Sequence, residues 1–276
     1  MNSVQNLSAW KAKLESILQS SDKPSSEIIA EIRNLGVEMG PHNAKTLLKS
    51  RPDFFAYRAK LQQSYHDYII RNERLQTQKL LREEWDGVTP FIDLTNPHSW
   101  RNYSRSIDMF DHIDFSNCMK MVLVGSGWMP ATLFHVQDKT DVPTLIGIDI
   151  VLDAVESSNR LAKRYGYERV TTELHDGCSY DYNRADVIYV VGMVSSKPAI
   201  LSRIADTAPE NVQVIVSEPY SLAVLWEDQI EPSLDPRLEV VGRGKDWYAS
   251  RTPLTGKGLG SAALSRDLYL RRRIAP

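Results

Sequence analysis

Residues 121–132 read Met-Val-Leu-Val-Gly-Ser-Gly-Trp-Met-Pro-Ala-Thr, and residues 144–150 read Thr-Leu-Ile-Gly-Ile-Asp-Ile. The first apolar run ends in two glycines that flank Ser126, and the second ends in Asp149. This pattern is typical of a nucleotide-type cofactor site at the edge of a parallel sheet. The glycines let the backbone approach the ligand, and the acid accepts hydrogen bonds from ribose hydroxyls. The alternatives are a tight turn without a ligand, and an Asp149 that caps a helix beginning near Leu152.

Pro130 stands where the dinucleotide fingerprint has its third glycine. A proline lacks the backbone N–H that would help the start of the following helix to bind a pyrophosphate. We therefore expect a nucleoside cofactor without phosphates, and S-adenosylmethionine (SAM) fits this description. Gly125, Ser126, Gly127 and Asp149 are its predicted nucleoside contacts.

The periodicity of the sequence changes near residue 118, where a helical pattern gives way to apolar runs that alternate with helical segments. Such alternation is typical of a doubly wound parallel sheet. We expect strands at 121–124, 144–150, 170–175, 187–194 and 212–216, and two late strands at 238–241 and 268–270 that could pair antiparallel at one edge. The predicted fold class is α/β. An all-α N-terminal domain at 1–118 precedes a Rossmann-like, class I methyltransferase-like SAM-binding domain at 119–276.

Helices are expected at three places in the N-terminal domain. Residues 1–20 carry an apolar stripe that includes Trp10 and Leu14 and could be core or a dimer contact. A second helix follows Pro24 and should end at Gly36 and Gly40-Pro41. A long helix should begin at Pro52 and run to about Trp85. Its second half, residues 71–84, is highly charged, so we expect at least half of it to be solvated.

Further ligand contacts are expected where the later strands end. Asp176 and Gly177 follow the third strand, where an acid of a SAM-binding sheet commonly receives the adenine amino group, although Asp-Gly also forms turns. Met193 ends the fourth run and should face the sulfur region or the core. Ser195 could bind a substrate carboxylate or cap the next helix.

Aromatic side chains are also candidates. Trp128 and Phe134 lie near the expected sulfonium, and an aromatic face stabilises such a cation by about 0.5–2 kcal/mol, although most such rings are core. Pro130 and Ile150 complete the predicted cofactor contacts. Residues 96–103 could form a lid that carries Tyr103 to the amino-acid end of the cofactor, or a plain surface helix. Residues 255–260 look like a mobile Gly-rich loop.

At these residues the sequence resembles a known group. Gly125-Ser-Gly-x-x-Pro-x-Thr132, followed by Gly147-Ile-Asp-Ile150, resembles the nicotianamine synthase-like branch of SAM-dependent enzymes. That branch includes opine-metallophore synthases and SAM cyclases that form azetidine-2-carboxylate. The match covers residues 119–166 and is looser to about 220. Ordinary methyltransferases usually have an acid before the glycine motif and a third glycine, where this chain has Val124 and Pro130.

The resemblance implies that an amine attacks the Cγ of SAM's methionine moiety and releases 5′-methylthioadenosine. In the synthases the amine belongs to a second substrate, and in the cyclase it is SAM's own. A transferase would, by the same resemblance, use a glutamate of the N-terminal domain as proton acceptor. The candidates are Glu73, Glu83 and Glu84, although their charged segment looks like solvated surface.

A cyclase needs no second substrate, only a closed and mainly apolar binding site for SAM. The aromatic residues named above are suited to line such a site, so cyclisation is the favoured hypothesis. Tyr103 and Ser195 are the expected contacts to the reacting end. Transfer to an amino-acid acceptor and conventional methyl transfer are the alternatives, and a helical interaction module on a degenerate Rossmann scaffold ranks last.

Composition narrows the classes of partner. The formal net charge of −2 argues against a nucleic-acid binder with a broad basic surface. Two cysteines suggest reduced thiols in a cytoplasmic protein, and the six histidines show no metal-ligand spacing. No stretch approaches the roughly 20 apolar residues needed to cross a bilayer. We expect a cytoplasmic enzyme that acts on a small molecule without a metal, with a homodimer as one option.

Overall fold

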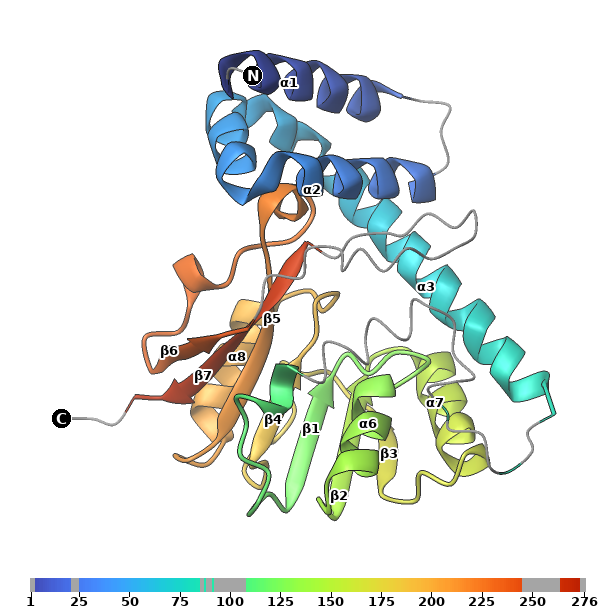
Figure 1. Ribbon diagram of the computed structural model, residues 1–276. Coiled ribbons are helices and arrows are strands. Elements are labelled where there is room, and N and C mark those ends of the chain that lie inside the picture. The colour runs from blue at the N-terminus through green and yellow to red at the C-terminus, as the bar shows by residue number, and fades with distance from the viewer. Residues whose placement is uncertain are drawn as a thin grey trace. The chain divides into compact units, whose positions relative to one another are not determined.

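The computed structural model describes residues 3–20, 25–84, 87, 91, 108–244 and 264–273 (Figure 1). They form two compact units. The described residues of the first, which we call the helical unit, are 3–20, 25–69, 218–229 and 264–266. Those of the second, the sheet unit, are 70–84, 87, 91, 108–217, 230–244 and 267–273. The helical unit is thus built from several stretches of the chain, the first of which ends at residue 69. The domain boundary at 118 stays a prediction.

A seven-stranded sheet with the order β3-β2-β1-β4-β5-β7-β6 forms the frame of the sheet unit (Figure 1). Its strands are β1 (Lys120–Val124), β2 (Thr144–Asp149), β3 (Val170–Leu174), β4 (Val187–Val190), β5 (Gln213–Pro219), β6 (Leu238–Arg243) and β7 (Ser265–Arg272). The pairs β1–β2, β2–β3, β1–β4 and β4–β5 are parallel, and β6 pairs with β7 antiparallel. The predicted parallel sheet with an antiparallel edge pair is therefore confirmed. Strand order reverses at β1, so the ends of β1 and β4 form the switch point where such sheets bind ligands.

Helices cover both faces of this sheet because side chains of each strand alternate between two cores. Met121 and Leu123 of β1 belong to one core, with residues of α6 (Ala131–Lys139) and α7 (Leu152–Arg164). Val122 and Val124 belong to the other, with residues of α8 (Lys197–Thr207). The 3₁₀ turn η3 (Glu231–Ser233) lies between β5 and β6 in the chain.

The helical unit contains α1 (Ser3–Gln19), α2 (Ser25–Ser50), η1 (Pro52–Tyr57), the first part of α3 (Arg58–Arg82) and η2 (Ser221–Leu225). α2 kinks at Gly40 (φ 74°), which Pro41 follows. The expected end at Gly36 is wrong, because Gly36 is helical and lets other segments pack closely. A Cβ on Gly36 would lie 2.7 Å from Leu264 Cδ1. The stripe residue Leu14 is buried in this unit, so it is core.

The long helix predicted from Pro52 begins as the 3₁₀ turn η1 and becomes α-helical at Arg58. No helix in the described part of the chain is long and apolar enough to cross a membrane.

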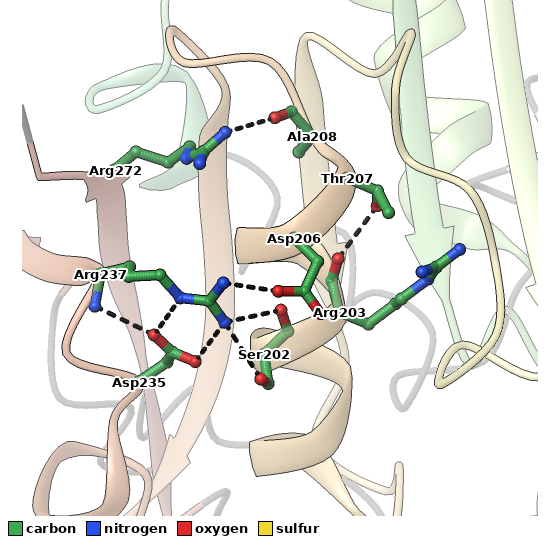
Figure 2. Close-up of polar contacts among 8 residues, drawn as sticks. All are labelled: Ser202, Arg203, Asp206, Thr207, Ala208, Asp235, Arg237 and Arg272. Atoms are coloured by element: carbon green, nitrogen blue, oxygen red, sulfur yellow. Dashed lines mark hydrogen bonds and ion pairs between the residues drawn. The ribbon is translucent and has the colours of Figure 1, made fainter.

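An arginine-centred network fastens α8 to the chain before β6 (Figure 2). Arg237 donates to Asp235 from Nε (2.9 Å) and Nη2 (2.8 Å), and it also pairs with Asp206 and Ser202 of α8. Hydrogen bonds from Arg237 hold the pKa of Asp235 well below its ordinary value. Arg272 adds a bond to the Ala208 carbonyl (2.7 Å). The network fixes α8, whose N-terminus follows the end of β4.

Candidate cofactor site

The glycine loop after β1 adopts backbone conformations that favour glycine. Gly125 and Gly127 have φ values of +80° and +65°. A Cβ on Gly125 would overlap the Val194 side chain, and one on Gly127 would lie 2.5 Å from Glu73 Oε2. The loop is held to β2, because the amides of Gly125 and Ser126 donate to the Ile148 carbonyl at 2.9 and 3.1 Å.

Asp149 ties the glycine loop to the end of β2. Its Oδ2 accepts the Gly127 N–H at 2.9 Å, and its Oδ1 accepts the Val151 N–H at 3.0 Å. Val151 is the N-cap residue of α7, and this cap makes no side-chain hydrogen bond. Asp149 therefore orders the loop, and the residue stays partly exposed at the sheet edge.

Glu73 lies against the same loop, which the sequence did not predict. It belongs to the second part of α3, residues 70–82, in the sheet unit. Its carboxylate accepts a hydrogen bond from the Trp128 backbone N–H. One turn on, the Thr77 hydroxyl donates to the Trp128 carbonyl (3.3 Å), and the Leu80 carbonyl accepts the Tyr165 hydroxyl (2.9 Å). This face of α3 is thus fixed to the start of α6 and the end of α7.

A second layer of polar contacts supports that placement. The Trp128 indole Nε1 donates to Asp153 Oδ2 at 3.1 Å, and Arg74 Nη2 lies 3.3 Å from the same oxygen. Asp153 belongs to the first turn of α7. Two segments far apart in the sequence, α3 and α7, therefore converge on the glycine loop.

Electrostatics give Glu73 a pKa near neutrality. The residue keeps some exposed surface, but its carboxyl group is enclosed by protein. Burial, together with the negative charge of Asp149, raises the pKa of Glu73 to about 7, against the lowering effect of the Trp128 N–H. Glu83 and Glu84 are exposed, and Glu83 pairs with Lys79 at 3.4 Å. Of the three predicted glutamates, Glu73 is therefore the one suited to proton transfer at neutral pH.

The loop between β4 and α8 covers the glycine loop through Val191 and Val194, which approach Gly125. Ser196 has a left-handed backbone (φ 61°) and is the N-cap of α8. Ser195 is exposed and is not the N-cap residue, so its capping role is wrong, while its substrate contact stays a prediction. Met193 is partly exposed in this loop.

Asp176 and Gly177 form the turn after β3. Asp176 is exposed, and its Oδ1 accepts the Cys178 N–H at 2.8 Å. A Cβ on Gly177 would lie 2.8 Å from Val124 Cγ1, so this turn approaches the end of β1 closely. Two apolar side chains stay open to solvent at the same edge, Ile150 (68% exposed) and Leu174 (53%). Leu174 is the register partner of Asp149.

The remaining predicted cofactor contacts are either buried or lie outside the described residues. Phe134 is 1% exposed and stacks on Tyr167 with ring centroids 4.0 Å apart, so its ring packs in the core of the sheet unit. Trp128 and Pro130 are buried in the turn before α6. Tyr103, the segment 96–103 and the loop 255–260 lie outside the described residues. Within the described residues the buried Ser126 hydroxyl, which packs over Gly147, makes no hydrogen bond.

No family model matches the chain, and no curated protein matches it either. Among solved structures it is similar to a glutamate-to-glutamine variant of the nicotianamine synthase MtNAS in complex with SAM. The TM-score is 0.72 and the identity 14%, over 96% of this chain and 98% of that one. MtNAS in complex with MTA and tNA gives a TM-score of 0.72 and 13% identity, over 98% of each chain.

The chain shares the fold of nicotianamine synthase. At this identity the comparison confirms the predicted fold, a Rossmann-like sheet preceded by helices. Among the described residues, no group of three His, Cys, Asp or Glu side chains could hold a metal ion.

Proposed function

We propose that this protein is a SAM-dependent enzyme in which a nitrogen attacks Cγ of SAM's 3-amino-3-carboxypropyl arm and 5′-methylthioadenosine leaves. The observation that carries the proposal is the Glu73 carboxyl group against the glycine loop, with a pKa of about 7. An amine attacks only in its neutral form, and a carboxylate poised near neutrality can accept its proton.

The sheet edge has the features that a nucleoside requires. Asp149 offers carboxylate oxygens for ribose hydroxyls, and its bond to Gly127 leaves further acceptor capacity. Ile150 and Leu174 are apolar side chains that an adenine ring would cover, and Asp176 lies in the next turn. Pro130 at the helix start supplies no N–H for a pyrophosphate. This donor and acceptor set fits SAM better than a dinucleotide.

The proposed step balances as a simple displacement. The nitrogen lone pair forms the N–Cγ bond, the Cγ–S pair leaves with sulfur, and the proton of the nitrogen passes to the Glu73 carboxylate. When bound, SAM supplies a sulfonium leaving group and a positive charge that would favour the ionised form of Glu73. Asp149 and the Trp128 N–H hold the carboxyl and the loop together. The chain's own contribution is thus position and a proton acceptor.

Cyclisation to azetidine-2-carboxylate is our finer proposal, with Glu73 taking the proton of SAM's own ammonium group. It needs no second substrate. Transfer to a separate amine is the alternative, and the similarity to MtNAS, whose structure holds MTA and tNA, supports it. A proton acceptor at Glu73 would suit either nitrogen, so the product decides between them.

The test is mass spectrometry of products after incubation of the full chain with SAM alone at pH 8, and again with a mixture of amino acids. Methylthioadenosine and a cyclic C4 amino acid from SAM alone would support cyclisation. Methylthioadenosine that needs an added amino acid would support transfer. S-adenosylhomocysteine in place of methylthioadenosine would overturn the proposal.

A further inference from the structure

Arg33 is a buried cation of the helical unit, and no described residue supplies an anion to it. This α2 residue is 7% exposed, and within the described residues its guanidinium makes no ion pair and its Nε no hydrogen bond. Its guanidinium carbon lies 5.0 Å from the centroid of the Tyr65 ring. A cation–π contact offsets only part of the hydration that a buried guanidinium loses. The buried Nε–H of Arg33 therefore remains to be satisfied.

Trp226 brings a second unsatisfied donor to the same place. It is 2% exposed, and within the described chain its buried indole N–H has no acceptor. Its ring lies 5.7 Å from the Tyr65 ring at an interplanar angle of 45°. Arg33 from α2 and Trp226 from the segment after η2 thus flank one tyrosine of α3. Buried donors are normally paired, so two unpaired donors around one ring indicate a missing acceptor.

Two other arginines of the helical unit do have oxygen partners. Arg58 pairs with Asp228 (2.6 Å) and donates to the Val224 carbonyl (3.2 Å). Arg51 pairs with Asp53 (2.6 Å). The helical unit therefore satisfies these two guanidiniums with its own oxygens, and it leaves the more deeply buried Arg33 without one.

We propose that Arg33 and Trp226 form a binding site for a small monocarboxylate. A guanidinium presents paired N–H groups that match the two oxygens of a carboxylate, and the indole N–H adds a further donor. One positive charge balances one negative charge, whereas a phosphate dianion would bring an excess charge into a buried place. The rings of Tyr65 and Trp226 would flank the apolar part of the ligand.

Two sources could supply this carboxylate, an amino acid that reacts with SAM or an amino acid that binds without reacting. The binding site itself does not depend on the proposed function, and its test contains no SAM. Only the assignment as a reacting substrate rests on that function. A failure of SAM chemistry would therefore leave the binding result intact.

The test is titration of the full chain with each of the twenty amino acids, followed by tryptophan fluorescence and isothermal calorimetry. Histamine, tyramine and tryptamine are matched probes that lack the carboxylate of histidine, tyrosine and tryptophan. We expect saturable binding of at least one amino acid and at least about tenfold weaker binding of its amine, as for a lost charge-assisted hydrogen bond. Equal binding of acid and amine, or no saturable binding by any of the twenty, would overturn the proposal.

Variants can distinguish an Arg33 that binds a ligand from an Arg33 that only supports the fold. Arg33→Met should abolish carboxylate binding and raise the melting temperature, because it removes a buried charge that no protein group balances. Arg58→Met is the matched control, which should lower the melting temperature and leave binding unchanged. Trp226→Phe removes only the indole donor and should weaken binding less than Arg33→Met does. An Arg33→Met protein that is destabilised like Arg58→Met and still binds the acid would contradict the site.

A final arm identifies the source of the carboxylate. The amino acid that binds is incubated with SAM, and products are examined by mass spectrometry. Its incorporation into a product would make the site an acceptor site. Binding without incorporation would make it a site for an amino acid that does not react, and either result retains the carboxylate assignment.

Discussion

Two carboxylates of the sheet unit, Asp235 and Glu73, are held in opposite ways. Asp235 bonds to Arg237 through both oxygens, and these bonds keep its pKa low (Figure 2). Glu73 is enclosed and pairs with no cation among the described residues, and burial beside Asp149 raises its pKa to about 7. A paired carboxylate stabilises a fold, whereas one buried near a like charge costs stability. Such a cost is typical of sites where a proton must be moved at neutral pH.

Replacing Glu73 should have its largest effect on the rate of methylthioadenosine formation. Glu73→Gln keeps the shape of the side chain and an oxygen for the Trp128 N–H, but it removes the proton acceptor. We expect the rate of methylthioadenosine formation to fall by about 10²–10⁴-fold. Initial rates by liquid chromatography measure this, with SAM binding by calorimetry as the control for an intact site. A variant that retains at least about a third of the wild-type rate would remove Glu73 from the chemistry.

The same variant should be more stable than the wild type at pH 8. The pKa of Glu73 rises from 4.5 to about 7 on folding, so between these values the folded chain binds more protons than the unfolded one. Stability therefore falls as pH rises through this window and then stays level. Glu73→Gln should raise the free energy of unfolding by about 2–3 kcal/mol at pH 8 and change it little at pH 4. Urea denaturation at both pH values checks this; a loss of stability at pH 8 would argue that Glu73 is structural.

The close approach of Glu73 to the glycine loop can be tested with a matched pair of glycines. Gly127 and Gly166 both have positive φ, but a Cβ on Gly127 meets Glu73, while one on Gly166 meets nothing within 4 Å. Gly166→Ala should cost about 1 kcal/mol for the left-handed backbone alone. Gly127→Ala should cost a further 1–3 kcal/mol, about as much as overpacking does, and weaken SAM binding. Equal costs would mean that Glu73 does not press on the loop.

The smallest expected effect concerns the paired carboxylate. Asp235→Asn should lower the free energy of unfolding at pH 7 by about 1 kcal/mol, because the side chain of its partner Arg237 is 45% exposed. The low folded pKa means that this contribution is present above the ordinary pKa of an aspartate and is lost only in strong acid. Methylthioadenosine formation should be unchanged. A large loss of activity would show that the network near α8 acts on the site.

Sequence patterns predicted the features that depend on local chemistry. The glycines, Asp149 and the strand alternation were readable because a parallel sheet imposes turns and periods on neighbouring residues. The burial of Glu73 was not readable, since it lies in a charged segment and is enclosed by contacts with Gly127 and Trp128, far along the chain. The signal that could have found it is the spacing of Glu73, Thr77 and Leu80 on one helix face.

Two other features depend on tertiary packing in the same way. Phe134 looked like a cofactor wall, but its stacking partner Tyr167 comes from a separate segment and places it in the core. Arg33 carries no motif, and its isolation becomes visible only once Tyr65 and Trp226 are brought to it. Sequence periodicity predicts which face of a helix or strand a side chain lies on. It does not predict which distant residues pack against that side chain.

The pH dependence of methylthioadenosine formation from SAM tests the central claim most directly. With Glu73 as proton acceptor, kcat/KM should rise about tenfold per pH unit in acid and level off above a pKa near 7. The residual rate of Glu73→Gln should lack that limb. A wild-type profile that is flat from pH 5 to 9, or faster in acid, would contradict a carboxylate base at the glycine loop.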